Sequence, residues 1–80
     1  MSQGGPTSWR QALNNELQRP GVNKAVEYRC TADGPLHQQL WTAIAYIDGE
    51  EYGIGERLLS KDGAKEQAAK SAYLRYMKPH

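Results

Sequence analysis

The stretch Ser60-Lys61-Asp62-Gly63-Ala64-Lys65-Glu66-Gln67-Ala68-Ala69 decides the fold of this 80-residue chain. Its alanines, which continue to Ala72, recur at helical spacing and predict a helix that packs closely on a neighbour. Pro79 prevents this helix from running far beyond Met77. The chain therefore closes with one helix, and the residues before it have to supply the surface that this helix covers.

The first turn of this predicted helix is suited to bind anions. Ser60 or Asp62 can cap it, and Lys61 and Lys65 stand one turn apart beside it. The free backbone N–H groups and the positive dipole end of a helix attract negative charge. We therefore predict a phosphate clamp at this point, which favours nucleic acid as the partner.

A first helix is predicted near the start of the chain. Ser8 has the pattern of an N-cap, and Gln11, three residues later, completes a capping box. Pro20-Gly21 ends the helix. Its apolar side chains recur at i, i+4 and i+8 and form one stripe, which consists of Trp9, Leu13 and Leu17.

The middle of the chain has the periodicity of strands. Residues 26–32 alternate between apolar and polar, and Asp33-Gly34-Pro35 breaks this pattern. Residues 41–47 and 51–58 form two further strands, joined by the strong hairpin signal Asp48-Gly49. The sequence therefore predicts an α+β fold in the order α-β-β-β-α, with a three-stranded antiparallel sheet and both helices packed on one face.

Composition predicts one small domain over residues 8–78, after a disordered tail at residues 1–7. The net charge is only +1, but residues 60–80 carry five Lys and Arg against two Asp and Glu, a local basic patch. Cys30 is the only cysteine, which favours an intracellular protein of the cytoplasm or nucleus over a secreted one. No stretch approaches the ~20 apolar residues of a membrane span, so we expect no membrane partner.

The sequence offers no motif for catalysis. It contains no His/Cys cluster with the spacing of metal ligands, no Gly-x-Ser-x-Gly turn and no Gly-x₄-Gly-Lys loop. His37 and His80 are far apart in sequence. We therefore expect no enzyme activity, no catalytic residue, no metal, no cofactor and no small-molecule substrate.

Three features in this order and spacing resemble the double-stranded RNA-binding domain. They are Tyr28 in the first strand, the loop Gly34-Pro35-Leu36-His37, and the run from Ser60 to Ala69. The similarity covers about residues 9–77. Trp41 stands where the family usually has Phe, and Gly53-Ile54-Gly55 stands where the family has glycines before the second helix.

The resemblance implies binding to the shape of A-form RNA, largely without sequence preference. Such RNA displays 2′-hydroxyls in a shallow minor groove, and these domains span about 16 bp along two minor grooves and the phosphates between them. The first helix would lie in one minor groove, with Asn15 and Glu16 as the contacting pair. Gln11 and Gln18 are the alternative candidates, because the apolar stripe fits the family pattern only with a shift of one residue.

The resemblance also implies two further contacts. Gly34, Pro35 and His37 would reach the second minor groove, where the imidazole can donate to a hydroxyl or, when protonated, to a phosphate. Lys61 and Lys65 would reach the phosphates across the major groove. Together with the first helix, these residues would form an RNA-binding surface of three separate points.

The sequence departs from the family pattern at the start of the last helix. Asp62 replaces a second lysine, Gly63 weakens the helix by up to ~1 kcal/mol, and Arg57-Leu58-Leu59 makes the preceding segment one residue longer. We expect this insertion to shift the start of the helix. We also expect weaker binding than a full lysine triad would give, with a slope of log affinity against log salt of about −2 to −3. Replacing Asp62 by Lys should then tighten the binding of duplex RNA.

Other functions remain open at this stage. Some domains of this family dock proteins or self-associate, and Ile44 and Tyr46, on the sheet face away from the helices, are candidates for such a contact. A double substitution of Lys61 and Lys65 by Ala separates RNA binding from protein docking. Loss of RNA binding supports the first function, and loss of self-association supports the second. The resemblance further implies that the domain is a module of a larger RNA-processing or regulatory protein.

Overall fold

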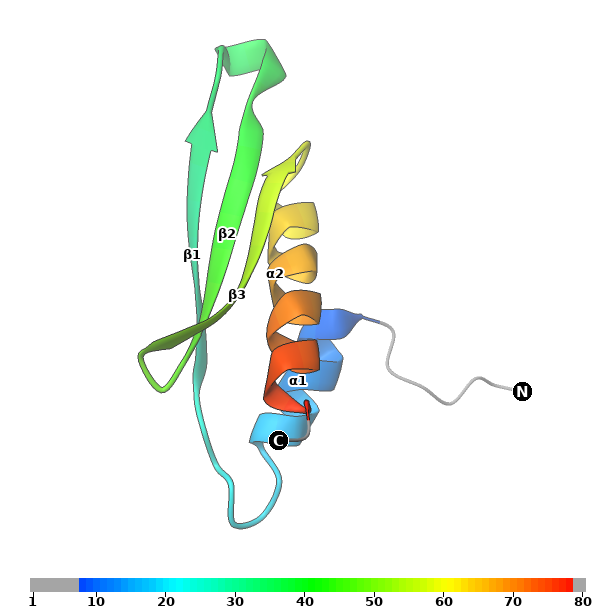
Figure 1. Cartoon of the computed structure of the whole chain (residues 1–80). Helices are drawn as coiled ribbons and strands as arrows, with labels where there is room; N and C mark the ends of the chain where they lie inside the picture. Colours follow the sequence, from blue (N-terminus) through cyan, green and yellow to red (C-terminus); the bar gives the residue numbers. More distant parts are fainter. Residues whose placement is uncertain (1–7, 79–80) are drawn as a thin grey trace, which may run out of the picture.

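The computed structural model describes residues 8–78, and its fold is the predicted one. The tail predicted for residues 1–7 lies outside the described residues. Figure 1 shows the elements in chain order, which are α1 (Trp9–Leu17), β1 (Val26–Asp33), the short 3₁₀ turn η1 (Leu36–Gln38), β2 (Leu40–Ile47), β3 (Glu50–Leu58) and α2 (Lys61–Tyr76).

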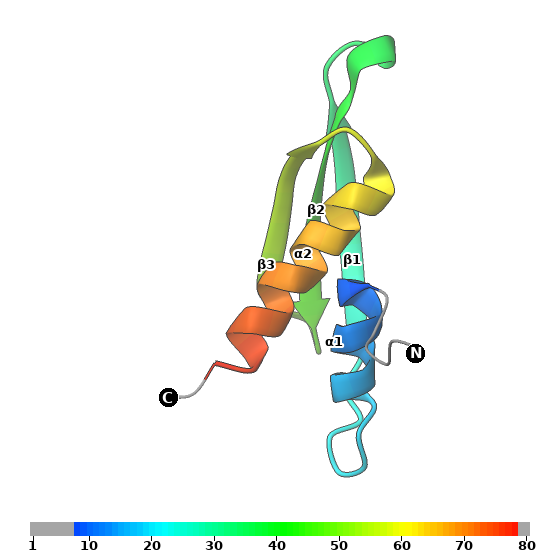
Figure 2. The same cartoon turned by 90° about the vertical axis from the view of Figure 1, so that its right-hand side faces the viewer.

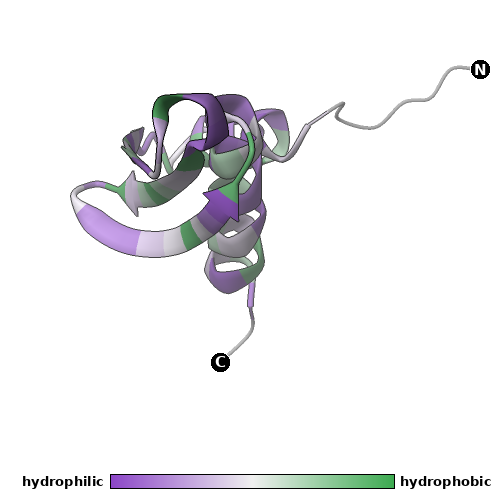
Figure 3. Ribbon diagram, turned by 90° about the horizontal axis from the view of Figure 1, so that it is seen from above, coloured by the Kyte–Doolittle hydropathy of each residue, from purple (hydrophilic) through white to green (hydrophobic). Residues whose placement is uncertain are grey.

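The three strands form one antiparallel sheet in the order β1-β2-β3. Seen from above, both helices lie on one side of this curved sheet (Figure 3). The connection between β2 and β3 is the predicted hairpin, and Asp48 and Gly49 both have positive φ, 51° and 82°. Two such residues in sequence make the turn whose twist matches that of the flanking strands. The local sequence therefore fixes the register of this hairpin.

The core between the helices and the sheet is built from small side chains. Leu13, Leu17 and Ile47 are the largest fully buried side chains, and the other buried apolar residues are alanines of β2 and α2. Each alanine contributes little apolar area, so the backbones have to approach closely to exclude water. This explains the alanine repeat of the last helix.

The closest approach lies between α2 and β3, at the two glycines of that strand. A Cβ atom added to Gly53 would lie 2.9 Å from Cα of Ala72, and one added to Gly55 would lie 2.9 Å from the backbone nitrogen of Ala68. Such separations are inside van der Waals contact, so these positions have room only for hydrogen. The pair of glycines and the alanine repeat form one seam, which we call the glycine–alanine seam.

The extra residue predicted before α2 corresponds to an irregularity inside β3. The register of β3 on β2 shifts between the pairs Trp41–Leu58 and Ala43–Gly55, and Arg57 adopts a left-handed conformation with φ of 61°. This is a β-bulge, which takes up one extra residue in a strand. The helix then begins at Lys61, directly after the candidate cap, so the insertion is accommodated in the strand.

Both predicted helix caps form. The Ser8 hydroxyl accepts the backbone N–H of Gln11 at 3.1 Å, and the Ser60 hydroxyl accepts that of Gly63 at 2.9 Å. Ser60 and not Asp62 is therefore the N-cap of α2. A Cβ atom on Gly63 would lie 2.9 Å from the Ser60 hydroxyl oxygen, so the glycine that weakens the helix also leaves room for its cap.

Candidate nucleic-acid interface

The three predicted contact regions lie along one side of the molecule. Figure 2 shows them in a row, with the β1–β2 loop at the top, the first turn of α2 in the middle and α1 at the bottom. The sheet sets the position of the loop, and the glycine–alanine seam sets the position of α2 on that sheet. The order of the three regions is the one that the resemblance implies.

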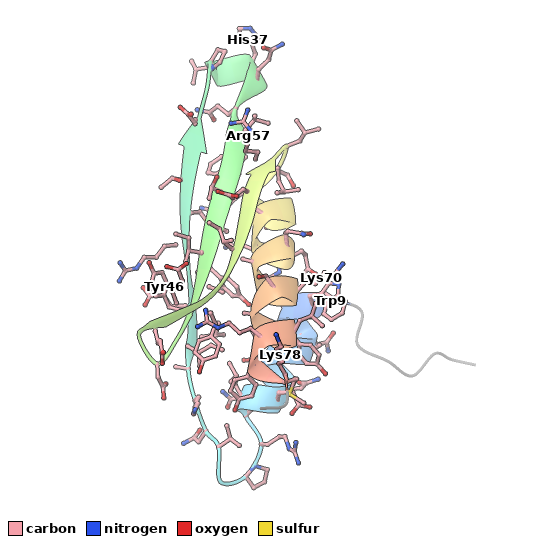
Figure 4. All side chains as sticks on the ribbon, in the orientation of Figure 1. Trp9, His37, Tyr46, Arg57, Lys70 and Lys78 are labelled. Atoms are coloured by element: carbon pink, nitrogen blue, oxygen red, sulfur yellow. The ribbon has the colours of Figure 1, made fainter. Side chains whose placement is uncertain are left out.

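The β1–β2 loop is shaped by its own backbone. Gly34 has a φ of 101°, a region that glycine enters without steric cost, and its N–H donates to the carboxylate of Asp33 at 3.0 Å. Pro35 then begins η1, and its carbonyl oxygen accepts the N–H of Gln38 at 2.9 Å. His37 is exposed at the tip of the molecule (Figure 4). This loop presents an imidazole to solvent on a turn that its neighbours hold.

Lys61 lies on the side of α2 that faces this loop. Its Nζ sits over the Trp41 ring, 5.8 Å from the centroid, and Trp41 is the second residue of β2, just after the loop. The contact is a cation–π interaction, which leaves the other hydrogen atoms of the ammonium group available to a ligand. Lys65 follows one helical turn later, and within residues 8–78 it has no ion pair or hydrogen bond through its side chain.

Asp62, which replaces a lysine of the family pattern, faces α1. Its carboxylate lies 3.7 Å from the guanidinium of Arg10, although its side chain is 81% exposed. Glu66, one turn later on the same face, accepts the backbone N–H of Trp9 at 2.8 Å and the Nε–H of Arg10 at 2.8 Å. Asp62 and Glu66 each come one residue after a lysine, and one residue corresponds to a rotation of about 100° around the helix axis. The acidic face is therefore separate from the face of Lys61 and Lys65.

The Arg10–Glu66 pair perturbs both groups. Desolvation acts to raise the pKa of Glu66, but the hydrogen bonds from the Arg10 side chain and from the backbone N–H groups of Trp9 and Arg10 outweigh it and hold that pKa below its usual value. The hydrogen bond to Glu66 in turn raises the pKa of Arg10, against the desolvation that lowers it. An acidic side chain of α2 thus caps the N-terminus of α1.

The predicted contact pair on α1 is split by the structure. Asn15 is exposed and projects opposite the buried stripe of Leu13 and Leu17. The Glu16 side chain is only 25% exposed, and its carboxylate binds Arg19 at 3.1 Å. Among the alternatives, Gln18 is the C-cap residue, and its amide donates to the carbonyl oxygen of Lys24 at 3.4 Å.

Comparison with known proteins decides the family. Residues 9–76 match the family model described as the double-stranded RNA binding motif. The chain belongs to this family. Its most similar relatives include Ribonuclease 3 of Corynebacterium efficiens, 37% identical over 67 residues, which are 84% of this chain and 26% of that protein. Ribonuclease 3 of Streptomyces coelicolor is 36% identical over 70 residues, 88% of this chain and 25% of that protein.

The double-stranded RNA binding motif thus spans about a quarter of the length of these relatives. Within residues 8–78, the structure has no group of three or more His, Cys, Asp or Glu side chains able to hold a metal ion. No helix in the same range is long and apolar enough to cross a membrane. The double-stranded RNA-binding function of the domain follows from its membership of the family.

One further exposed amide on α1, Asn14, is not among the residues predicted from the sequence. Asn14 is exposed and, with Gln11 three residues earlier, lines an open groove of about 470 Å³ between α1 and β1. Tyr28 lines the same groove, and its hydroxyl is buried without a hydrogen-bond partner. Burial raises the pKa of Tyr28, so the phenol stays neutral. Gln11 and Asn14 stand at positions i and i+3, which lie on one face of a helix. This spacing is the signal in the sequence that points to Asn14.

Proposed function

We propose that the domain binds an RNA duplex at three points along one side of A-form geometry. In this proposal α1 enters one minor groove, the loop with Gly34, Pro35 and His37 enters the next, and Lys61 and Lys65 hold the phosphates between them. The contact of Lys61 with Trp41, at 5.8 Å, carries the proposal, because it keeps the lysine on the side of the loop. A protein that reads shape needs such fixed spacing.

For the first contact we propose Asn15 together with Asn14. Both amides are exposed, and an amide both donates and accepts, as recognition of a 2′-hydroxyl requires. Glu16 is the weaker member of the predicted pair, because its carboxylate is engaged by Arg19 and carries a charge that phosphates repel. A comparison of Asn15→Ala with Glu16→Gln in RNA titrations separates the two: we expect a clear loss of affinity only for the first.

An NMR titration tests the proposal as a whole. The chain is titrated in parallel with a short RNA duplex, a DNA duplex of the same sequence and a single-stranded RNA. We expect saturable shifts with the RNA duplex alone, confined to α1, the His37 loop and the first turn of α2. Equal shifts with DNA would exclude recognition through 2′-hydroxyls, and shifts outside these three regions would exclude this surface.

We also propose that the domain contributes binding and no chemistry of its own within a larger RNA-processing protein. The length comparison supports this, since the relatives are about four times as long as the matched region. An intracellular location in the cytoplasm or nucleus stays a prediction, supported by the free thiol of Cys30. Incubation of the chain with labelled duplex RNA and Mg²⁺ tests the first point, and any protein-dependent cleavage would contradict it.

Self-association through Ile44 and Tyr46 stays a second prediction. Both side chains lie on the sheet face away from the helices, and Tyr46 points away from the helix layer in Figure 4. The guanidinium of Arg29 covers the Tyr46 ring at 4.8 Å, which reduces the apolar surface available there. Sedimentation at increasing concentration tests this prediction, and a monomer throughout would contradict it.

A further inference from the structure

The outer surface of the helical layer carries a second exposed cluster, apart from the RNA-binding side. Leu74 is 54% exposed, Met77 44% and Trp9 38%, and the Trp9 ring packs against Tyr73 with the ring centroids 5.7 Å apart. Lys70 and Lys78 flank these side chains, and Figure 4 shows Trp9, Lys70 and Lys78 on the helical side of the molecule. We call this cluster the outer patch, which consists of Trp9, Lys70, Tyr73, Leu74, Met77 and Lys78.

The outer patch is continuous by helix geometry. Lys70, Leu74 and Lys78 follow one another at intervals of four residues on α2 and beyond its end, and Tyr73 and Met77 form the adjacent row. Leu74 lies 13 residues after Lys61, which is about 20 Å along the helix axis. A ligand on the outer patch therefore leaves the first turn of α2 open to RNA.

The charges of the outer patch select an acidic partner. Within residues 8–78, neither Lys70 nor Lys78 forms an ion pair, and the Lys70 ammonium lies over the Trp9 ring, 5.8 Å from its centroid. Glu66, one turn before Lys70, is engaged by Arg10 and by the N-terminus of α1. Among the described residues, no carboxylate neutralises these two cations beside the exposed apolar side chains, which gives complementarity to a surface that is apolar and negative.

Two other occupants of the outer patch are disfavoured. The shapes of its side chains disfavour a single-stranded nucleic acid, and its charges disfavour a second copy of the chain. Leu74 and Met77, its most exposed apolar members, have no flat face on which a nucleobase stacks, and Lys70 covers one face of the Trp9 ring. A symmetric contact with a second copy of the chain would bring Lys70 and Lys78 against the same residues of the partner, which repel. An α-helix that carries leucines on one face and carboxylates beside them fits both the apolar row and the lysines.

We propose that the outer patch is a docking site for an acidic amphipathic helix of a protein partner. The exposed rows of α2 and Trp9 bury the apolar face of that helix, and Lys70 and Lys78 pair with its carboxylates. This site does not depend on RNA binding, since it uses none of the residues of the RNA-binding side. The domain then holds a duplex on one side and a protein on another.

The probe is a synthetic amphipathic helix of about 16 residues, long enough for four turns, with leucines on one face and glutamates on the other. The ¹⁵N-labelled chain is titrated with this peptide, with a matched peptide in which lysines replace the glutamates, and with a single-stranded RNA. We expect saturable shifts of the Trp9 indole and of residues 70–78 with the acidic peptide alone, at a dissociation constant below about 1 mM.

Two variants and a control sharpen the test. Leu74→Ser/Met77→Ser should weaken the acidic peptide by at least ~10-fold, and Lys70→Glu/Lys78→Glu should reverse the preference toward the basic peptide. Arg75→Ser removes a cation from the same helix outside the patch and should leave peptide binding unchanged. All variants should keep duplex RNA binding, which shows that they fold. Equal binding of both peptides, preference for single-stranded RNA, or no saturable shift would each overturn the proposal.

Discussion

Glu66 accepts the backbone N–H of Trp9 at 2.8 Å, so the second helix supplies an N-terminal cap for the first, 57 residues earlier in the chain. The same carboxylate accepts the Nε–H of Arg10 at 2.8 Å. One side chain therefore closes the junction between the helices. This junction holds α1 at a fixed place beside α2, and with it the minor-groove contact that we propose for the first helix.

Replacement of Glu66 by Gln should destabilise the domain by about 1 kcal/mol, because the helix cap loses its negative charge and the ion pair with Arg10 is lost. The wild-type domain should also lose stability as the pH falls. The pKa of Glu66 is lowered by folding, so its contribution is complete above the unfolded pKa, near 4.5, and disappears as the pH falls through the folded value. Urea unfolding at pH 7 and pH 3 measures both effects, and an equal pH dependence in the variant would contradict this assignment.

The glycine–alanine seam should not tolerate a methyl group. Gly53→Ala and Gly55→Ala each force a Cβ atom against the backbone of α2, so we expect a loss of about 1–3 kcal/mol or a failure to fold. Gly49→Asn is the matched control, since asparagine tolerates the left-handed conformation of that turn and nothing lies within 4 Å of an added Cβ atom. Thermal unfolding of the three variants gives the comparison, and a stable Gly55→Ala protein would show that the seam can open.

Arg57 in its left-handed conformation is a site of backbone strain, with φ of 61°. A non-glycine residue in this region costs roughly 1–2 kcal/mol, while glycine adds entropy to the unfolded chain worth roughly 0.5–1 kcal/mol. Arg57→Gly should therefore raise the free energy of unfolding by a few tenths to about 1 kcal/mol. Arg57→Ala, which keeps the strain, should bring no such gain. A destabilised Arg57→Gly domain would mean that the arginine side chain stabilises the bulge.

The double variant Lys61→Ala/Lys65→Ala should lose most of its affinity for duplex RNA. Each lost phosphate contact should also reduce the slope of log affinity against log salt by about 0.9, the value for duplex DNA. Arg29→Ser is the control, because this cation lies on the sheet face away from the helices. Binding titrations over a series of salt concentrations measure both quantities. An unchanged salt slope in the double variant would exclude the two lysines from phosphate contact.

Asp62→Lys should tighten binding to duplex RNA and steepen the salt dependence, since it removes a negative charge and adds a positive one beside Lys61. Its cost in stability should be below about 1 kcal/mol, because the pair of Asp62 with Arg10 is exposed and 3.7 Å apart. Asp62→Asn should have a smaller effect of the same sign. Should neither variant change the affinity, Asp62 would lie beyond the reach of phosphates.

The sequence predicted those parts of the fold that depend on neighbouring residues. Asp48-Gly49 determines its turn through local φ preferences, and Ser8 and Ser60 cap helices three residues ahead of them. It could not predict contacts between distant segments. The pairing of Glu66 with α1 and the position of Arg57 in a bulge both depend on how the elements pack, and no local pattern encodes them.

The candidate site divides in the same way. The loop with His37 and the two lysines of α2 follow a local motif, and the structure puts this loop and the first turn of α2 on one side of the molecule (Figure 2). The first helix has no such motif to fix its register. A shift of one residue along this helix replaces an exposed side chain by one that is held in an ion pair. That is why Asn15 proved exposed while Glu16 is bound to Arg19.

The seam between β3 and α2 has a mechanical consequence. Where large side chains separate a helix from a sheet, rotamer changes let the two layers slide; here main chain meets main chain, and that freedom is missing. The span from the tip of the sheet to the start of α2 should then behave as a ruler of constant length. Such a ruler accepts a nucleic acid whose groove spacing matches it and rejects one that would have to stretch.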